Sequence, residues 1–120
     1  MERVKVVVIT GGSGYIGGYT LNRLIEDGLA DKIYLFDIKP PRKEVWTPEV
    51  HKAFESGTVV YQYMDVRDSL MLDEDKVDLI FNFAAVHREP GHEAYEYFET
   101  NIKGADNVIA FAEDKHCSKI

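Results

Sequence analysis

Residues 5–17 read KVVVITGGSGYIG, and this stretch decides the fold. After Lys5, every residue up to Thr10 is β-branched, which is typical of a strand buried on both faces of a parallel sheet. The glycines that follow predict a tight turn, and apolar residues at near-helical spacing predict a helix over residues 15–27. A strand, a glycine-rich turn and a helix therefore open the predicted fold.

The rest of the chain alternates between predicted strands and helices. Strands are predicted over residues 32–37, 58–63 and 77–83, and helices over residues 48–55 and 93–114, with a turn of helix over 68–76. One apolar face of the last helix is predicted from residues spaced by three or four: Ala94, Phe98, Ile102, Ala105, Ile109 and Ala112. Lys119 and Ile120 suit the start of another strand. Such alternation builds right-handed βαβ units, so we predict an α/β fold, a Rossmann-type doubly wound parallel sheet with about four strands in this chain, ordered 3-2-1-4.

The composition excludes several classes of protein. The chain has 120 residues, of which 45% are hydrophobic and 29% charged, which excludes a disordered chain, a collagen and a coiled coil. Lysine and arginine number 14 against 21 acidic residues, and the net charge of −7 argues against a nucleic-acid partner and against docking on anionic membranes. A phosphate ligand stays open, because backbone amides bind phosphate without basic side chains.

Cysteine usage and apolar runs indicate the compartment. Cys117 is the single cysteine, so no internal disulfide is available and a reducing compartment is indicated. The longest apolar run, residues 6–9, is far shorter than the ~20 residues of a membrane helix, and it does not have the pattern of a signal peptide. We therefore expect a cytoplasmic protein with no membrane partner.

Gly11, Gly14 and Gly17 form the pattern G-x-x-G-x-x-G between the first predicted strand and helix. In a dinucleotide-binding turn, the first glycine permits the sharp turn, the second lets a pyrophosphate approach the backbone, and the third lets helix and strand pack closely. The N–H groups at the start of the helix then face the phosphates. No Gly-Lys-Ser/Thr follows, which argues against a P-loop for ATP or GTP.

Asp37 stands at the end of the second predicted strand, twenty residues after Gly17. A carboxylate at this position accepts hydrogen bonds from the adenosine ribose and repels a 2′-phosphate, so NAD is favoured over NADP. Lys39, Arg42 and Lys43 follow closely and leave NADP open, because a basic loop neutralises an added phosphate. A turn-capping role is the alternative for Asp37.

Five motifs follow one another along the chain: the glycine pattern, Asp37, DVRD at residues 65–68, NFAA at residues 82–85 and NIKG at residues 101–104. In this order and context they resemble the extended short-chain dehydrogenase/reductases, specifically the NAD-dependent sugar-nucleotide epimerases and dehydratases. The resemblance covers nearly the whole chain, but only the N-terminal part of such proteins. It implies that residues 1–120 are the N-terminal part of an NAD(P)-binding Rossmann domain, with the rest of that domain and the substrate-binding region outside this sequence.

The resemblance also implies which residues hold the NAD. Tyr15 and Ile16 lie on its pyrophosphate side, Asp65 and Val66 flank the adenine, residues 83–86 line the path to the nicotinamide ribose, and Asn101 sits near the cofactor. The full implied set is Gly11, Gly14, Tyr15, Ile16, Gly17, Asp37, Ile38, Asp65, Val66, Phe83, Ala84, Ala85, Val86 and Asn101. From the residues alone, three alternatives stay open: a turn role for Asp65, plain close packing for the alanine pair and a buried structural amide for Asn101.

The histidines do not have the spacing of a metal site. His87 is expected near the reacting centre, where it is either a catalytic group or a solvated loop histidine. His87 and His92 lack ligand spacing, and His92-Glu93 lacks the second histidine of a zinc-protease helix. We therefore predict no metal.

The catalytic pair that the resemblance implies is a tyrosine followed four residues later by a lysine. None of the seven tyrosines has a lysine at that spacing, so no catalytic residue is assigned and it stays open whether this chain alone is an enzyme. The predicted function is the NAD-binding portion of a sugar-nucleotide epimerase or dehydratase, which moves hydride to and from the nicotinamide at a sugar carbon. The alternatives are a non-enzymatic dinucleotide-binding sensor or interaction domain, and an NADP-dependent ketone reductase of the same family. The implied partners are the dinucleotide, a nucleotide-sugar substrate of the complete protein and a second copy in a homodimer.

Overall fold

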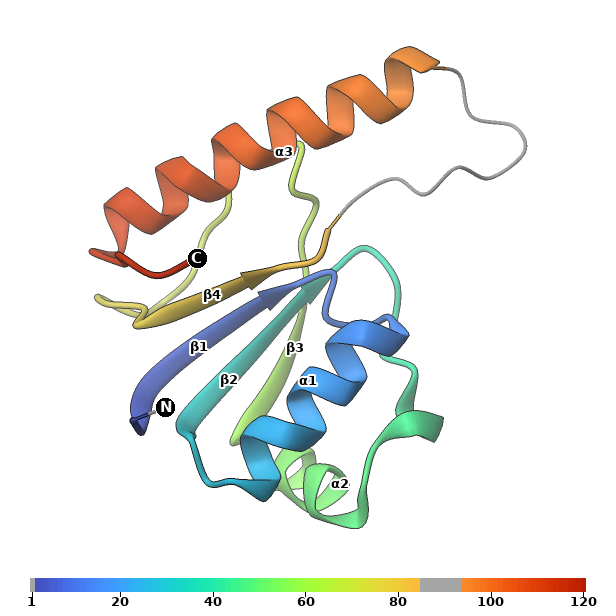
Figure 1. Cartoon of the computed structure of the whole chain (residues 1–120), viewed down its shortest axis with the longest axis vertical. Helices are drawn as coiled ribbons and strands as arrows, with labels where there is room; N and C mark the ends of the chain where they lie inside the picture. Colours follow the sequence, from blue (N-terminus) through green and yellow to red (C-terminus); the bar gives the residue numbers. More distant parts are fainter. Residues whose placement is uncertain (1, 85–93) are drawn as a thin grey trace.

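The computed structural model describes residues 2–84 and 94–120, and the side chains of these residues except 94–100. The elements follow one another as β1 (Val4–Thr10), α1 (Tyr15–Glu26), β2 (Ala30–Asp37), η1 (Lys43–Val45, a 3-10 turn), α2 (Pro48–Glu55), β3 (Val59–Tyr63), β4 (Leu79–Asn82) and α3 (Ala94–Asp114). The strands form one sheet in the order β3-β2-β1-β4, and every neighbouring pair is parallel (Figure 1). The predicted α/β class and strand order are confirmed.

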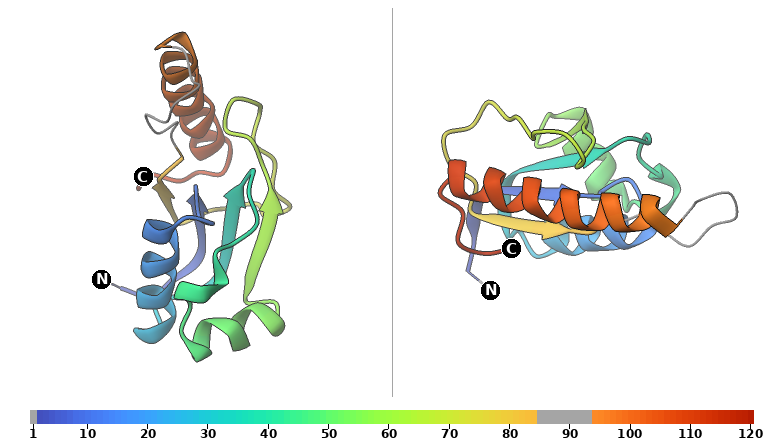
Figure 2. Two further views of the ribbon diagram at one scale, coloured as in Figure 1. Left: turned by 90° about the vertical axis from the view of Figure 1, so that its right-hand side faces the viewer. Right: turned by 90° about the horizontal axis from the view of Figure 1, so that it is seen from above.

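Helices cover both faces of the sheet. In Figure 1 and Figure 2, α1 and α2 lie against one face, and α3 lies across the other. The alternation of side chains along β1 explains these layers: Val7 and Ile9 belong to the core shared with α1 and α2, whereas Val8 belongs to the core shared with α3. All three side chains are fully buried, as expected for a strand covered on both faces.

The carboxyl ends of the strands meet along one edge of the sheet. The register places Thr10 opposite both Phe36 and Asn82, and it places Asp37 opposite Tyr63. The residues that follow each strand therefore leave the sheet close together. We call this side the carboxyl edge, and the side where β1 and β4 begin the amino edge.

The predicted buried face of α3 is wrong in part. Ala112 is buried as predicted, but Ile102 and Ile109 are 51% and 49% exposed, and Gly104 and Val108 are buried instead. Both sets of residues have helical spacing, so the periodicity alone does not choose between them. The glycine decides, because a Cβ at Gly104 would lie 3.0 Å from a methyl carbon of Val66, and the helix therefore approaches the rest of the protein at this residue.

The turn of helix predicted over residues 68–76 is also wrong, because this segment is irregular. Leu70 and Leu72 both pack against the core on the α3 side, and two residues is the spacing of an extended chain rather than of a helix. Two hydrogen bonds hold the segment: the Tyr34 hydroxyl donates to the Glu74 carboxylate, and the Lys115 ammonium donates to the Leu72 carbonyl at 2.9 Å.

A groove runs along the outer side of β4, opposite its contact with β1. It has a volume of about 370 Å³ and is lined by residues 79–83 and Ile120. The N–H of Ile80 donates to the Lys119 carbonyl at 3.0 Å, so the last described residues lie beside this strand. The sequence predicted a further strand at this point; the structure shows the neighbouring placement without a regular strand at residues 119–120.

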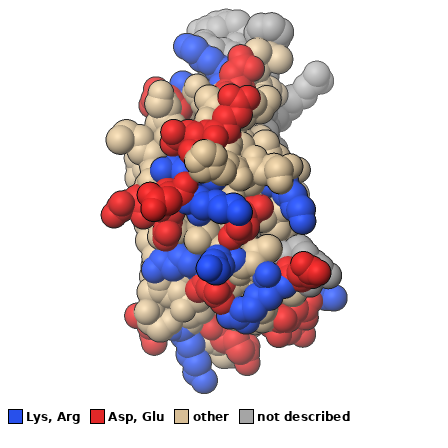
Figure 3. All heavy atoms as spheres, turned by 90° about the vertical axis from the view of Figure 1, so that its left-hand side faces the viewer, with Lys and Arg blue, Asp and Glu red and all other residues tan. Residues whose placement is uncertain are grey.

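Charges of both signs are mixed over the face shown in Figure 3, where red acidic and blue basic side chains alternate. The described residues on this face therefore form no continuous basic surface of the kind that follows a nucleic-acid backbone. Within residues 2–84 and 94–120, no helix is long and apolar enough to cross a membrane.

Candidate functional site

Gly11 makes the turn out of β1 with a left-handed backbone, at a φ of +66°. Its N–H donates to the Phe36 carbonyl at 2.8 Å, which ties the turn to the end of β2. A Cβ at Gly11 would lie 2.7 Å from the Phe83 carbonyl carbon, closer than side chains approach backbone. Both the backbone angle and the segment after β4 therefore require glycine at this position.

Gly17 lets α1 pack directly onto the turn. A Cβ at Gly17 would lie 2.6 Å from the Gly12 carbonyl oxygen, so the close approach is to the backbone of Gly12. Gly18, which the sequence analysis missed, has a similar role, because a Cβ there would lie 2.5 Å from a methyl carbon of Val45, the last residue of η1. The close packing of helix and turn predicted from the glycine pattern is present.

Gly14 differs from these glycines, because the fold itself does not require it. Its φ is −79°, and the nearest heavy atom to a Cβ would be the Gly11 carbonyl oxygen at an ordinary 3.7 Å. Gly14 is the N-cap of α1, which has no side-chain cap and no acidic residue in its first turn. The start of α1 therefore presents N–H groups and a positive dipole end beside open space, which suits an anionic ligand.

Ser13 joins the turn to the chain that follows β2. Its N–H donates to the Asp37 carboxylate at 3.1 Å, and its carbonyl accepts from the N–H of Arg42 at 3.0 Å. The side chain is only 3% exposed, and its hydroxyl has no hydrogen-bond partner among the residues that the structure describes. A buried hydroxyl without a partner costs free energy, and this one lies in the turn that leads into α1.

Asp37 both caps a turn and keeps room for a ligand. Besides the bond from Ser13, its carboxylate accepts from the Lys39 N–H at 3.0 Å, which is the turn-capping role left open by the sequence. A carboxylate has about four acceptor positions, so these two bonds leave capacity for ribose hydroxyls. The Tyr61 hydroxyl donates to the Asp37 carbonyl at 3.1 Å, and burial together with the Asp37 charge raises the pKa of Tyr61. Ile38, next in the chain, is 48% exposed at this edge.

The first turn of α1 and the segment after β3 lie at the same edge but differ in exposure. Tyr15 and Ile16 are 51% and 64% exposed. Val66, in contrast, is 7% exposed and packs in the core beneath α3. The Asp65 carboxylate is bound by Arg67, with Nη2 at 2.8 Å and the backbone N–H at 2.9 Å. The hydrogen bonds from Arg67 hold the pKa of Asp65 below its usual value, so this carboxylate is ionised and fixed in a turn.

The end of β4 is tied to the end of β1. The Thr10 hydroxyl donates to the Asn82 side-chain oxygen and accepts from the N–H of Ala84 at 3.4 Å. The N–H of Phe83 donates to the Thr10 carbonyl at 3.0 Å, and the Phe83 ring stacks on Phe81. Thr10 is fully buried and holds this segment against the glycine turn. Its role was missed, although its place before Gly11 is a signal.

The remaining predictions concern the segment after β4 and α3. Ala85, Val86 and His87 fall outside the described residues, as does His92. Asn101 is exposed on α3, so the alternative of a buried structural amide is wrong for it. Asn107, which the sequence analysis missed, donates to the Val66 carbonyl at 2.7 Å and holds α3 against the segment after β3. In the part of the chain that the structure describes, no three acidic, histidine or cysteine side chains gather as a metal site.

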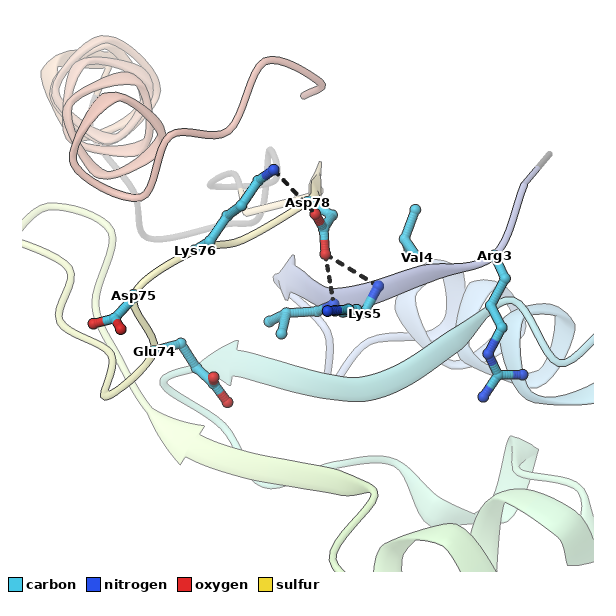
Figure 4. Close-up of a pocket in the computed structure, with 8 residues that line it drawn as sticks. Arg3, Val4, Lys5, Glu74, Asp75, Lys76 and Asp78 are labelled. Carbon is cyan, nitrogen blue, oxygen red and sulfur yellow. Dashed lines mark hydrogen bonds and ion pairs between the residues drawn. The ribbon is translucent and has the colours of Figure 1, made fainter.

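A second hollow, of about 480 Å³, lies at the amino edge between the start of β1 and residues 74–78 (Figure 4). The Asp78 carboxylate accepts from the N–H groups of Lys5 and Val6 at 3.1 and 2.9 Å, and Lys76 lies 3.8 Å from the same carboxyl group. The Asp78 carboxylate in this hollow therefore serves the start of β1. In open parallel sheets, ligands bind at the carboxyl ends of the strands, so the glycine turn is the better candidate site.

Comparison with known proteins bears on this site. The model of the 3-beta hydroxysteroid dehydrogenase/isomerase family matches residues 8–120, which is nearly the whole chain. The chain belongs to this family. The resemblance to extended short-chain dehydrogenase/reductases of the epimerase and dehydratase type, predicted from the five motifs, is thereby confirmed.

Curated relatives include the UDP-glucose 4-epimerases of Rickettsia conorii and Rickettsia canadensis, which are 31% and 32% identical over 97% of this chain. The chain spans about 35% of the length of these relatives. A solved UDP-galactose 4-epimerase matches with a TM-score of 0.71 and 24% identity, over 93% of this chain and 35% of the other. The dTDP-glucose 4,6-dehydratase of Bacillus anthracis, solved with NAD, matches with a TM-score of 0.70 and 19% identity, over 97% of this chain and 36% of the other. These structural likenesses show the Rossmann-type fold.

Proposed function

We propose that this chain is the NAD-binding portion of a sugar-nucleotide epimerase or dehydratase. The observation that carries the proposal is the set of groups without partners at the carboxyl edge. These are the uncapped start of α1, the open side of Gly14 and the Ser13 hydroxyl, which has no partner among the described residues. Pyrophosphate oxygens and ribose hydroxyls complement these groups. The names of the Rickettsia relatives support nucleotide-sugar chemistry for the complete protein.

Each residue of the proposed site has a task in binding. The N–H groups of residues 15–17 hold the pyrophosphate, and Gly11 and Gly17 keep the turn in shape. Asp37 accepts from the adenosine ribose beside Ile38, and Asp65 with Val66 bounds the adenine. Residues 83–86 and Asn101 flank the nicotinamide side. NAD, when bound, supplies the hydride acceptor for a sugar carbon, while this chain binds and orients it.

The cofactor preference of the proposed site follows from Asp37. Because its carboxylate is already fixed by two N–H groups, it cannot turn away from a 2′-phosphate without losing those bonds. We therefore propose NAD rather than NADP. The homodimer implied by the resemblance stays a prediction.

A second candidate is a ketone reductase that uses NADP. The description of the matching family, which names hydroxysteroid dehydrogenases, favours it, and so does the basic segment after Asp37. It differs from the first candidate in cofactor preference, which the following experiment measures.

Isothermal titration of the 120-residue chain with NAD+ and with NADP+ tests the proposal. We expect NAD+ to bind more tightly, and we expect Asp37→Asn to reduce that preference by about threefold or more, since the repulsive charge is removed. Asp31→Asn is the matched control, because Asp31 lies at the other end of β2 and pairs with Arg3. Failure of both dinucleotides to bind would overturn the proposal, and a preference for NADP+ would favour the second candidate.

The source gene tests the enzymatic half of the proposal. We expect the reading frame to continue beyond residue 120 with a strand, a serine or threonine, and then a tyrosine followed four residues later by a lysine. A stop codon directly after residue 120 would favour the non-enzymatic dinucleotide-binding domain instead.

A further inference from the structure

Three basic residues follow Asp37, and the structure separates their roles. Lys43 turns towards α2, where its ammonium lies 4.5 Å from the centre of the Phe54 ring and 6.0 Å from that of Trp46. Arg42 turns towards the glycine turn instead, where its guanidinium carbon lies 4.7 Å from the centre of the Tyr15 ring. The segment after β2 therefore brings the Arg42 guanidinium to the first residue of α1.

Arg42 is held at this place from two sides. Its N–H donates to the Ser13 carbonyl at 3.0 Å, and its Nη1 donates to the Tyr15 hydroxyl at 3.2 Å. Tyr15 is the first residue of α1, so the guanidinium contacts a side chain of the first helical turn, which has no acidic residue. The exposed side chain of Arg42 thus has a fixed base, and a guanidinium has five N–H donors to offer.

The buried hydroxyl of Ser13 is a second feature of the same turn. Ser13 is linked to Asp37 through its N–H and to Arg42 through its carbonyl, and its hydroxyl is buried without a described partner. A phosphate oxygen accepts hydrogen bonds from hydroxyl, N–H and guanidinium groups together, which a neutral group does less well. The Arg42 guanidinium uses Nη1 on the Tyr15 hydroxyl, and its other N–H groups are of the kind that bind such an anion.

We propose that Arg42 is a phosphate-binding residue of this site, held by Tyr15 and Ser13 against a phosphate on the adenosine half of the dinucleotide. This inference rests on the proposed function. The inference adds Arg42 to the site, a residue outside the glycine pattern that the segment after β2 brings beside the glycine turn. The phosphate is either the pyrophosphate, which NAD+ and NADP+ share, or the 2′-phosphate, which NADP+ alone carries.

The test is titration calorimetry of the 120-residue chain and its Arg42→Gln variant with NAD+, NADP+ and adenosine. We expect the variant to lose about tenfold in affinity for at least one dinucleotide, as for a charge-assisted hydrogen bond, and to keep its affinity for adenosine. A loss that includes NAD+ assigns the guanidinium to the pyrophosphate, and a loss confined to NADP+ assigns it to the 2′-phosphate. Arg23→Gln is the matched control, because Arg23 is an exposed arginine in the last turn of the same helix, paired with Asp27 at 2.7 Å.

Tyr15→Leu tests the aromatic support separately. It keeps the bond between the Arg42 N–H and the Ser13 carbonyl but removes the ring and the hydroxyl of Tyr15, so we expect a smaller loss for the same dinucleotides. Thermal unfolding of each variant checks that the fold is intact, which the exposure of both side chains favours.

The inference is overturned if Arg42→Gln binds both dinucleotides within about threefold of the unmodified chain, or if adenosine weakens as much as they do, which would mean that the guanidinium contacts the base. If the unmodified chain binds neither dinucleotide, the proposed function fails as well. If the unmodified chain binds a dinucleotide and Arg42→Gln binds it equally well, this inference alone is overturned.

Discussion

The two edges of the sheet differ in what their polar groups do. The amino edge has an open hollow of about 480 Å³, where the Asp78 carboxylate is engaged by two N–H groups of β1 and by Lys76 (Figure 4). The carboxyl edge has an uncapped helix start, a Ser13 hydroxyl with no partner in residues 2–84 and 94–120, and a glycine at 14 that the fold does not need. We therefore place the proposed ligand site by unused hydrogen-bonding capacity rather than by volume.

The largest effect is expected where the carboxyl edge depends on close packing. Gly17→Ala puts a methyl group 2.6 Å from the Gly12 carbonyl oxygen, and backbone has no cheap way to move aside. We expect this variant to lose about 3 kcal/mol of unfolding free energy in urea titrations. A loss below about 1 kcal/mol would mean that α1 does not pack on the turn as closely as described.

Gly14→Ala separates ligand binding from stability at the carboxyl edge, because its methyl group would fill open space beside the start of α1. Its methyl group would meet nothing closer than 3.7 Å, so we expect unfolding free energy to change by no more than about 1 kcal/mol. Affinity for NAD+, measured by calorimetry, is expected to fall about tenfold or more, since the methyl group lies where the pyrophosphate approaches. Unchanged affinity in a folded variant would show that the open side of Gly14 is not part of the site.

Asp78→Ala at the amino edge is expected to reduce stability without reducing affinity for NAD+, the reverse of Gly14→Ala. Two N–H groups of β1 lose their acceptor, so we expect unfolding free energy to fall by about 1 kcal/mol. Affinity for NAD+ is expected to stay at the level of the unmodified chain. A folded variant with clearly weaker binding would place the ligand at the amino edge and break the comparison.

The smallest effect concerns Tyr34, which ties residues 74–78 to the sheet through Glu74. Burial and the bond to the Glu74 carboxylate raise the pKa of Tyr34 from 10.0 to about 12. The folded state therefore holds this proton more tightly than the unfolded state, so the stabilisation is complete below pH 10 and is lost as the pH rises towards 12. Denaturant titrations of Tyr34→Phe at a series of pH values should show a weaker decline in this window, and an equal decline in both proteins would contradict the assignment.

Much of the carboxyl edge was predictable, because its geometry is set by local sterics. A β-branched strand followed by glycines at 11 and 17 leaves little choice of backbone, and the structure has the turn and the helix that these residues predict. Asp37 was predicted at the end of the second strand, and β2 does end at this residue. Such features depend on neighbours in sequence.

The errors lie where tertiary contacts choose between equivalent local patterns. The buried face of α3 is the one that carries Gly104, because only glycine allows the close approach to Val66. Residues 68–76 are not helical, because Leu70 and Leu72 both pack against the core. The contact between Arg42 and Tyr15 joins residues 27 positions apart, and no spacing in the sequence indicates it. Long-range packing of this kind is visible only once the sheet order is known.

The most direct test of the central claim is a titration of the 15N-labelled chain with NAD+, followed residue by residue through the amide signals. We predict shifts that cluster at Gly11–Gly17 and Asp37–Ile38, while the amides of residues 74–78 stay unchanged. Shifts that cluster at residues 74–78, or saturation with NAD+ that moves no amide of the glycine turn, would contradict the assignment of the site to the carboxyl edge.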